Sequence, residues 1–176
     1  MQIIGFVGPQ GGGKSTATEY VKIKGYTVLE MHTAAVEEAK RTGVEPNKVN
    51  LPAIGTRLRK EQGTDYAAKY LTKIIKEKNL QKVVISGIRS DFEINYFRKE
   101  FPEFKVAAIT ASLEARYERT KTRFPSKEAF LNREEEENKW GIAEGLNAAD
   151  ITIENTGTEE EFLKKVDQWL SNNSQE

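Results

Sequence analysis

Short runs of hydrophobic residues alternate with longer amphipathic segments along most of the chain. The short runs are nearly continuous, which is typical of strands buried on both faces of a parallel sheet. They predict strands at Ile3–Val7, Tyr26–Glu30, Lys82–Ser86, Lys105–Ala111 and Ile151–Glu154.

The longer segments repeat their apolar residues with a helical period of 3.6. Gly25 and Gly43 stop two of them, and Ser90 with Glu93 and Thr158 with Glu161 are capping-box pairs that begin two others. We expect helices at 14–24, 32–41, 51–62, 65–78, from Ser90 to near Pro102, 113–122, 127–140 and from Thr158 onward, with a loop at 45–50 and a polar tail at 171–176. Spacing predicts that the aromatic residues Tyr66, Tyr70, Phe92, Phe97, Phe162 and Trp169 lie in the core.

Strands that alternate with helices over the whole length predict an α/β fold. We expect a three-layer architecture, with a five-stranded parallel sheet and helices on both faces, in one domain of 176 residues. Ligands of such sheets bind beyond the carboxyl ends of the strands. Candidate site residues are therefore expected in the segments that follow the strands.

Composition narrows the possible chemistry. The chain has no cysteine, which excludes disulfides, thiol catalysis and cysteine-ligated zinc. Its 27 basic residues balance its 27 acidic residues, whereas a protein that binds nucleic acid usually has a basic excess. No stretch is long and apolar enough to span a membrane. We therefore expect a cytoplasmic protein with no nucleic-acid or membrane partner.

One strong motif stands between the first predicted strand and the first predicted helix. Residues 8–15, Gly-Pro-Gln-Gly-Gly-Gly-Lys-Ser, fit the pattern G-x-x-x-x-G-K-[ST] of a phosphate-binding loop. Glycines let backbone N–H groups approach phosphate oxygens, and the helix that follows points its positive end at the same place. The motif predicts ATP as substrate together with Mg²⁺. We expect Lys14 to contact the β- and γ-phosphates and Ser15 to bind the metal, with the rest of the nucleotide contacts from Gly8, Gly11, Gly12, Gly13 and Thr16.

Arginines outside this loop are candidates for binding the second substrate. Arg89 follows the third predicted strand, where a cation beside a phosphate loop suits a clamp on an acceptor's phosphate; the alternative is an exposed arginine near a helix start. Arg57 and Arg59 belong to the helical insert between the second and third strands, where an acceptor would bind.

Arg116, Arg119 and Arg123 are spaced to share one helix face. They form either a lid that covers the γ-phosphate or a solvated helix face. Arg133 belongs to the far side of such a lid or pairs with Glu136 or Glu137. The acidic run at 134–137 is interpreted as a solvated face rather than a metal site.

These residues together resemble the P-loop nucleoside-monophosphate-kinase superfamily, and most of all the archaeal dephospho-CoA-kinase-like and adenylate-kinase-related proteins. The resemblance spans nearly the whole chain. It rests on the phosphate loop and on short pieces at 58–63, 86–90, 116–123, 141–142, 149–150, Asn155 and Gly157.

The resemblance implies a core of residues 1–31, 79–115 and 141–171, an acceptor-binding insert at about 32–78 and a lid at about 116–135. It places the acceptor arginine at Arg89 and the lid arginines at Arg119 and Arg123. It also implies that the segment 155–158 binds the adenine, so that Asn155, Gly157 and Arg116 join the nucleotide contacts.

Two positions depart from the pattern of these kinases. Where many of them end the second strand in an aspartate that orients the acceptor, this chain has Met31 and His32. Where the third strand often ends in an acid that helps hold magnesium, this chain has Ser86. We hypothesise that Glu30, His32 or both replace the aspartate, because residues two apart in a strand share a face. The alternative is a solvated Glu30 and a His32 that caps the next helix.

The sequence favours an ATP-dependent kinase that transfers the γ-phosphoryl group to a small-molecule acceptor, either a nucleotide or a CoA precursor. The alternative is a nucleotide-dependent switch or slow ATPase that has no acceptor, which the two missing acids favour. An inert scaffold fits poorly with an intact phosphate loop. The sequence does not specify the acceptor, the preferred base or the oligomeric state.

Overall fold

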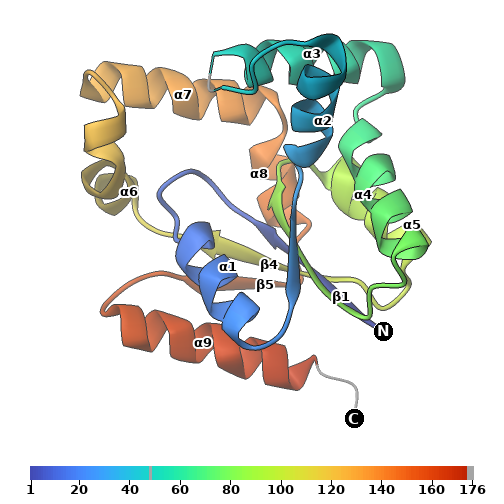
Figure 1. Ribbon diagram of the computed structural model, residues 1–176. Helices are drawn as coiled ribbons and strands as arrows, with labels where there is room; N and C mark the ends of the chain where they lie inside the picture. The colour runs from blue at the N-terminus through green and yellow to red at the C-terminus, as the bar shows by residue number, and fades with distance from the viewer. Residues whose placement is uncertain (48, 174–176) are drawn as a thin grey trace.

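The computed structural model describes residues 1–47 and 49–173. Its centre is a five-stranded parallel sheet in the order β2-β3-β1-β4-β5, formed by β1 Gln2–Val7, β2 Thr27–Glu30, β3 Lys82–Ile88, β4 Lys105–Thr110 and β5 Ile151–Glu154 (Figure 1). The predicted fold class is confirmed, because helices cover both faces of this sheet.

The helices follow the predicted amphipathic segments closely. They are α1 Lys14–Ile23, α2 Thr33–Thr42, α3 Asn50–Gln62, α4 Tyr66–Glu77, α5 Asp91–Glu100, α6 Leu113–Thr120, α7 Lys127–Lys139, α8 Ile142–Asn147 and α9 Glu159–Asn172. Short α8 was not predicted, since six residues between a tryptophan and a strand give too little periodicity to identify a helix.

Two hydrophobic cores lie on opposite faces of the sheet because successive side chains of each strand point to opposite sides. One core joins the strands to α1 and α9, with Phe6 packed against Trp169 at a ring separation of 5.9 Å. The larger core joins the strands to α4, α5 and α8 and continues into α2 and α3. The insert therefore shares the core of the sheet.

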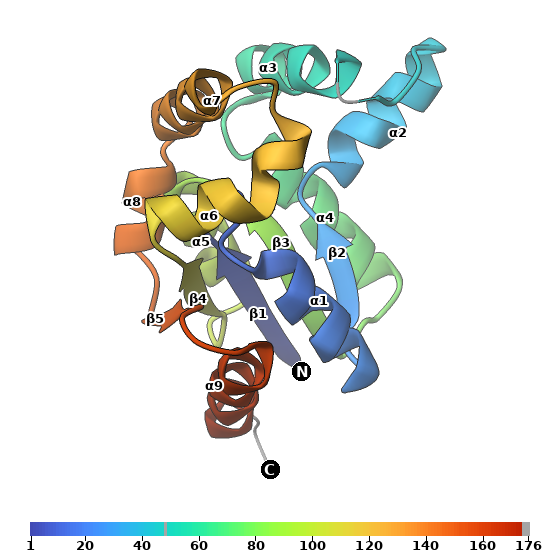
Figure 2. The ribbon, with the colours of Figure 1, turned by 90° about the vertical axis from the view of Figure 1, so that its left-hand side faces the viewer.

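The helices α3, α6 and α7 lie beyond the carboxyl ends of the strands, above the loop between β1 and α1 (Figure 2). A 3₁₀ turn, Lys121–Arg123, follows α6, and the Ser126 hydroxyl caps α7 by accepting a hydrogen bond from Ala129 N–H. These helices and α2 enclose the end of the sheet where ligands of parallel sheets bind.

Some local predictions need correction. Phe92 is exposed instead of buried, because it lies on the outer side of the first turn of α5. β3 extends to Ile88, two residues past Ser86, with Gly87 at a φ of 84°. The predicted capping box of Thr158 and Glu161 is complete. At the other predicted capping box, that of Ser90 and Glu93, the Glu93 carboxylate accepts a hydrogen bond from Arg89 N–H at 2.8 Å. Of the predicted tail, Ser171 and Asn172 finish α9, and residues 174–176 lie outside the described residues.

Candidate active site

The loop from Gly8 to Ser15 turns tightly between β1 and α1 and packs directly against other backbone. A Cβ at Gly12 would lie 2.7 Å from the carbonyl oxygen of Ile109, and one at Gly11, where φ is 72°, would lie 2.7 Å from the carbonyl oxygen of Arg116. Side chains at these positions would collide with backbone that cannot move aside. The glycines are therefore required by the packing of the loop as well as by phosphate approach.

Lys14 folds back over its own loop. Its Nζ donates hydrogen bonds to the carbonyl oxygens of Gly8 and Pro9, the second at 2.9 Å. Burial lowers the pKa of Lys14 to about 8; the Glu137 carboxylate opposes this shift, and the Arg89 guanidinium adds to it. Lys14 is thus a poorly solvated cation at the base of the pocket, where a bound phosphate would stabilise its charged form.

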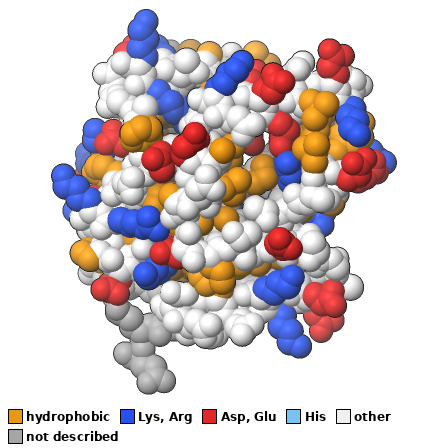
Figure 3. Space-filling model, turned by 180° about the vertical axis from the view of Figure 1, so that it is seen from behind, with side chains coloured by type: hydrophobic (Ala, Val, Ile, Leu, Met, Phe, Trp, Pro, Cys, Tyr) orange, Lys and Arg blue, Asp and Glu red, His pale blue; other side chains and the backbone are white. Residues whose placement is uncertain are grey.

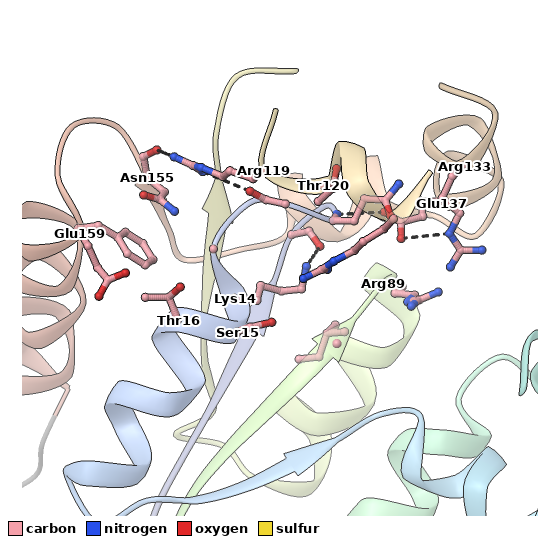
Figure 4. Close-up of a pocket in the computed structure, with 18 of the residues that line it drawn as sticks. Lys14, Ser15, Thr16, Arg89, Arg119, Thr120, Arg133, Glu137, Asn155 and Glu159 are labelled. Atoms are coloured by element: carbon pink, nitrogen blue, oxygen red, sulfur yellow. Dashed lines mark hydrogen bonds and ion pairs between the residues drawn. The ribbon is translucent and has the colours of Figure 1, made fainter. Parts of the chain in front are cut away.

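A cavity of about 650 Å³ opens over this loop. Ser15 and Thr16, at the positive N-terminal end of α1, line one side, and Asn155, Gly157, Glu159 and Phe162 line another (Figure 4). We call this cavity the nucleotide pocket. Its volume and its lining by the phosphate loop suit a nucleoside triphosphate.

Arg119 extends from α6 across the nucleotide pocket (Figure 4). Its guanidinium donates to the carbonyl oxygens of Gly11 at 3.2 Å and Asn155 at 3.0 Å. The Asn155 amide in turn donates to Gly12 O at 3.0 Å. The lid arginine and the predicted adenine segment are thus both attached to the phosphate loop.

Arg116 lies elsewhere than predicted. It is buried behind the loop, where it donates to Ala111 O at 3.2 Å and Gln10 O at 3.4 Å and pairs with Glu134. It does not line the nucleotide pocket. The predicted stripe of three arginines divides. Arg116 and Arg119 both belong to α6 but bind different backbone oxygens, and Arg123 lies in the 3₁₀ turn that follows the helix. Arg116 supports the loop, and Arg119 and Arg123 face the cavity.

The acidic run at 134–137 is a solvated face only in part, since Glu135 and Glu136 are exposed. Glu137 is buried, lines the nucleotide pocket, accepts a hydrogen bond from Gln10 N–H at 3.4 Å and lies 3.7 Å from Arg133 Nε. Arg133 also pairs with the exposed Glu136 at 3.0 Å. Because α7 crosses above the loop, one side of its acidic run faces the cavity and the other faces solvent.

A second cavity of about 490 Å³ lies between the insert and the lid, and we call it the acceptor pocket. Its walls are largely apolar, and four arginines line it: Arg59, Arg89, Arg123 and Arg133. The two pockets share five lining residues: Gln10, Gly87, Arg89, Arg123 and Arg133. They therefore meet next to the phosphate loop.

Trp140, directly after α7, is the aromatic centre of the acceptor pocket. The guanidinium carbons of Arg133, Arg89 and Arg59 lie 4.5, 4.8 and 5.7 Å from its ring centroid. Sequence reasoning missed Trp140, Gln10 and Glu137 as site residues. For Trp140, the available signal in the sequence was a single tryptophan at the end of a very polar helix.

The remaining predicted residues divide between the site and the surface. His32 lines the acceptor pocket, and the Glu30 carboxylate lies beside Gly87 and raises the pKa of Lys14 less than Glu137 does. β2 ends at Glu30, so strand alternation does not extend to His32, which has helical φ and ψ and no side-chain capping bond. Arg57 is exposed, pairs with Glu38 and Glu61 and lines neither pocket.

The outer surface is mixed in charge. The face opposite to that of Figure 1 carries Lys and Arg side chains interspersed with Asp and Glu (Figure 3). In the described ranges, no helix has the length and apolar character needed to cross a membrane.

Comparison with known proteins places this site in a family. A family model described as an AAA domain matches residues 4–140. The "UPF0200 protein" of Methanosarcina barkeri is 36% identical over 98% of this chain and 96% of its own length. The chain belongs to the UPF0200 family. A "UPF0200/UPF0201 protein" of Archaeoglobus fulgidus is 39% identical over 97% of this chain, which spans 55% of that relative's length.

Solved structures extend the relationship of this UPF0200 protein at the level of the fold. A Thermus thermophilus protein has a TM-score of 0.67 at 21% identity, with 98% of each chain covered. Shikimate kinase from Acinetobacter baumannii, solved with shikimate, has a TM-score of 0.58 at 19% identity and covers all of this chain and 96% of its own. The resemblance to P-loop kinases is thereby confirmed at the level of the fold, which is kinase-like.

Proposed function

We propose that this UPF0200 protein is an ATP-dependent phosphotransferase that transfers the γ-phosphoryl group to a small anionic acceptor, a nucleotide or a CoA precursor. The observation that carries the proposal is the junction of the two pockets. A pocket on a phosphate loop holds a triphosphate, and a second pocket holds the group that receives its terminal phosphoryl. Arg89, Arg123 and Arg133 line both.

Positioning and charge neutralisation supply most of the rate in phosphoryl transfer. Lys14 contacts the β- and γ-phosphates, and Arg119 and Arg123 neutralise charge from the lid. Arg89 holds the acceptor's anionic group at the junction. Arg89, Arg123 and Arg133 line the junction of the two pockets, and exclusion of water from it by bound substrates would strengthen each electrostatic contact.

Magnesium fits the residues of the nucleotide pocket. The Ser15 hydroxyl is exposed at the start of α1, and the chemistry of the pocket offers oxygen donors, which Mg²⁺ prefers. Mg²⁺ usually takes one or two protein ligands and completes its coordination with phosphate oxygens and water. When bound, it would supply positive charge that offsets the negative charge of the phosphates.

A slow ATPase or nucleotide switch is the second candidate function. Ser86 and His32 stand where the related kinases carry acids, and this observation favours it. Arg59 and the apolar walls of the acceptor pocket favour the kinase, because a switch without an acceptor does not need them.

A phosphoryl-transfer screen separates the two candidates. Purified protein with γ-labelled ATP and Mg²⁺ is offered nucleoside monophosphates, their deoxy forms and dephospho-CoA, and free phosphate release is measured in parallel. Labelled product above the rate of hydrolysis supports the kinase. Hydrolysis without product in every arm supports the ATPase or switch, and absence of nucleotide binding overturns both.

A further inference from the structure

The ring of Trp140 brings three like charges together. Arg59 comes from α3, Arg89 from the connection after β3, and Arg133 from α7, so three separate elements meet at one indole. Cations over a tryptophan face are attracted by the ring, and more strongly where water is excluded. This attraction offsets part of their mutual repulsion, but it leaves their charge unneutralised.

The carboxylates nearby are paired unevenly with this cluster. Arg133 pairs with Glu136 and Glu137, whereas Arg59 has, among the described residues, only the buried Glu93 at 3.7 Å. The Arg89 side chain has neither an ion pair nor a side-chain hydrogen bond within 1–47 and 49–173. Burial lowers the pKa of Arg89. A largely buried guanidinium without an anionic partner is unfavourable unless a ligand supplies one.

The remaining lining indicates what else the ligand carries. Met31, Leu51, Pro52 and Phe124 form apolar walls, which suit an organic body. Buried Gln10 Nε2 lines the same pocket and has no hydrogen-bond partner in the described part of the chain. An unpaired amide donor in the same pocket as the unpaired Arg89 guanidinium fits a ligand group with several acceptor oxygens.

We propose that Trp140 is the positioning residue that arranges Arg59 and Arg89 to bind a phosphomonoester dianion on the acceptor. The proposal rests on the proposed function and specifies its acceptor as a compound with a phosphomonoester on an apolar or aromatic body. A dianion engages both under-paired arginines at once, whereas a monocarboxylate leaves one of them unneutralised. Trp140 acts through the arginines and does not contact the reacting atoms.

The test uses binding and is independent of turnover. Phenyl phosphate, inorganic phosphate and benzoate are titrated into the full chain with its phosphate loop already filled by ADP and Mg²⁺. Tryptophan fluorescence is the readout. The chain has two tryptophans, and Trp169→Phe, in the opposite core, leaves Trp140 as the sole reporter. We expect phenyl phosphate to bind at least roughly tenfold more tightly than benzoate.

Variants then test the role of the indole by calorimetry. Trp140→Leu should weaken phenyl phosphate binding roughly tenfold and reduce the preference over benzoate, and Trp140→Phe should be intermediate because the cation–π attraction of phenylalanine is weaker. Arg89→Lys should weaken binding in the wild type but little in Trp140→Leu, since both act on one site.

Trp169→Phe is the matched control and should bind normally. Thermal unfolding shows whether each variant folds; if Trp140→Leu does not, Trp140→Phe and Arg89→Lys decide the outcome.

Three results would overturn the inference: equal binding of benzoate, unchanged binding in the Trp140 variants, or loss of phenyl phosphate binding once ADP fills the loop. The last result would place the anion on the phosphate loop instead. Failure of the proposed function is a separate outcome. In that case ADP does not bind, or the anion binds through Trp140 while no acceptor is phosphorylated.

Discussion

Arg119 and Asn155 meet over the nucleotide pocket, where the guanidinium of Arg119 donates a hydrogen bond to the backbone oxygen of Asn155 at 3.0 Å. The same guanidinium donates to Gly11 O at 3.2 Å. One exposed side chain of α6 thus connects the lid, the phosphate loop and the segment between β5 and α9. A triphosphate would replace backbone oxygens with more strongly charged acceptors at the same guanidinium.

We therefore expect Arg119→Ala to slow phosphoryl transfer by a factor of roughly 10² or more while the protein remains folded. Arginines that neutralise a transferring phosphoryl group contribute about 10³–10⁵ in rate in related chemistry. The measurement is single-turnover transfer or hydrolysis with saturating ATP. Arg57→Ala is the matched control, because Arg57 is exposed and lines neither pocket; it should remain within about twofold of wild type. A wild-type rate for Arg119→Ala would mean that Arg119 has only a structural role.

The Lys14 amine predicts a pH dependence of nucleotide binding. In the empty pocket the pKa of this amine is about 8, so the amine is positively charged below that pH and neutral above it. Triphosphate affinity should be level from about pH 6.5 to 7.5 and should fall as pH rises through about 8 to 9.5, with proton uptake on binding near pH 8. Calorimetry in buffers of different ionisation enthalpy measures both. Lys14→Met should bind weakly and show no transition in this range.

The same depressed pKa predicts an effect on stability. The unfolded lysine titrates near 10.5, so between about pH 8 and 10.5 the unfolded chain binds more protons and stability rises with pH. Below pH 8 the charged, buried amine costs at most about 3 kcal/mol. Lys14→Met should therefore raise the unfolding temperature of the empty protein at pH 7 while abolishing turnover. A lower unfolding temperature would mean that the bonds to Gly8 and Pro9 outweigh this cost.

Glu137 should tune that transition. Its carboxylate is the largest influence that raises the pKa of Lys14, so Glu137→Gln should lower that pKa further. The loss of triphosphate affinity should then begin at a lower pH than in the wild type. Glu135→Gln, an exposed neighbour on the same helix, is the control and should leave the transition in place. An identical pH profile for both variants would contradict an electrostatic role of Glu137.

Glu30 and His32 remain candidates for the work of the missing aspartate. If His32 accepts the acceptor's proton or hydrogen-bonds to it, His32→Asn should lower the transfer rate and alter its dependence on pH. Glu30→Gln should lower the rate without altering ATP affinity. Wild-type rates and profiles in both variants would favour the ATPase or switch.

The phosphate loop could be recognised from the sequence because its chemistry is local. The residues 8–15 are consecutive, and their glycines, lysine and serine act through backbone geometry that a strand and a helix on either side impose. The order of strands and helices was predictable for a similar reason, since apolar periodicity is carried by neighbouring residues. Arg89 could be predicted as a site residue because it follows a strand, and Arg119 because it shares one face of a predicted helix with Arg116 and Arg123.

The rest of the site depended on how distant elements pack. Four consecutive glutamates have no periodicity that distinguishes a buried face from a solvated one, so only the crossing of α7 over the loop buries Glu137. Arg116 and Arg119 lie three residues apart on α6, yet the guanidinium of one donates to Gln10 O behind the loop and that of the other to Gly11 O over the pocket. The cluster at Trp140 joins residues from three separate elements, and burial and contact between such segments are decided by tertiary packing.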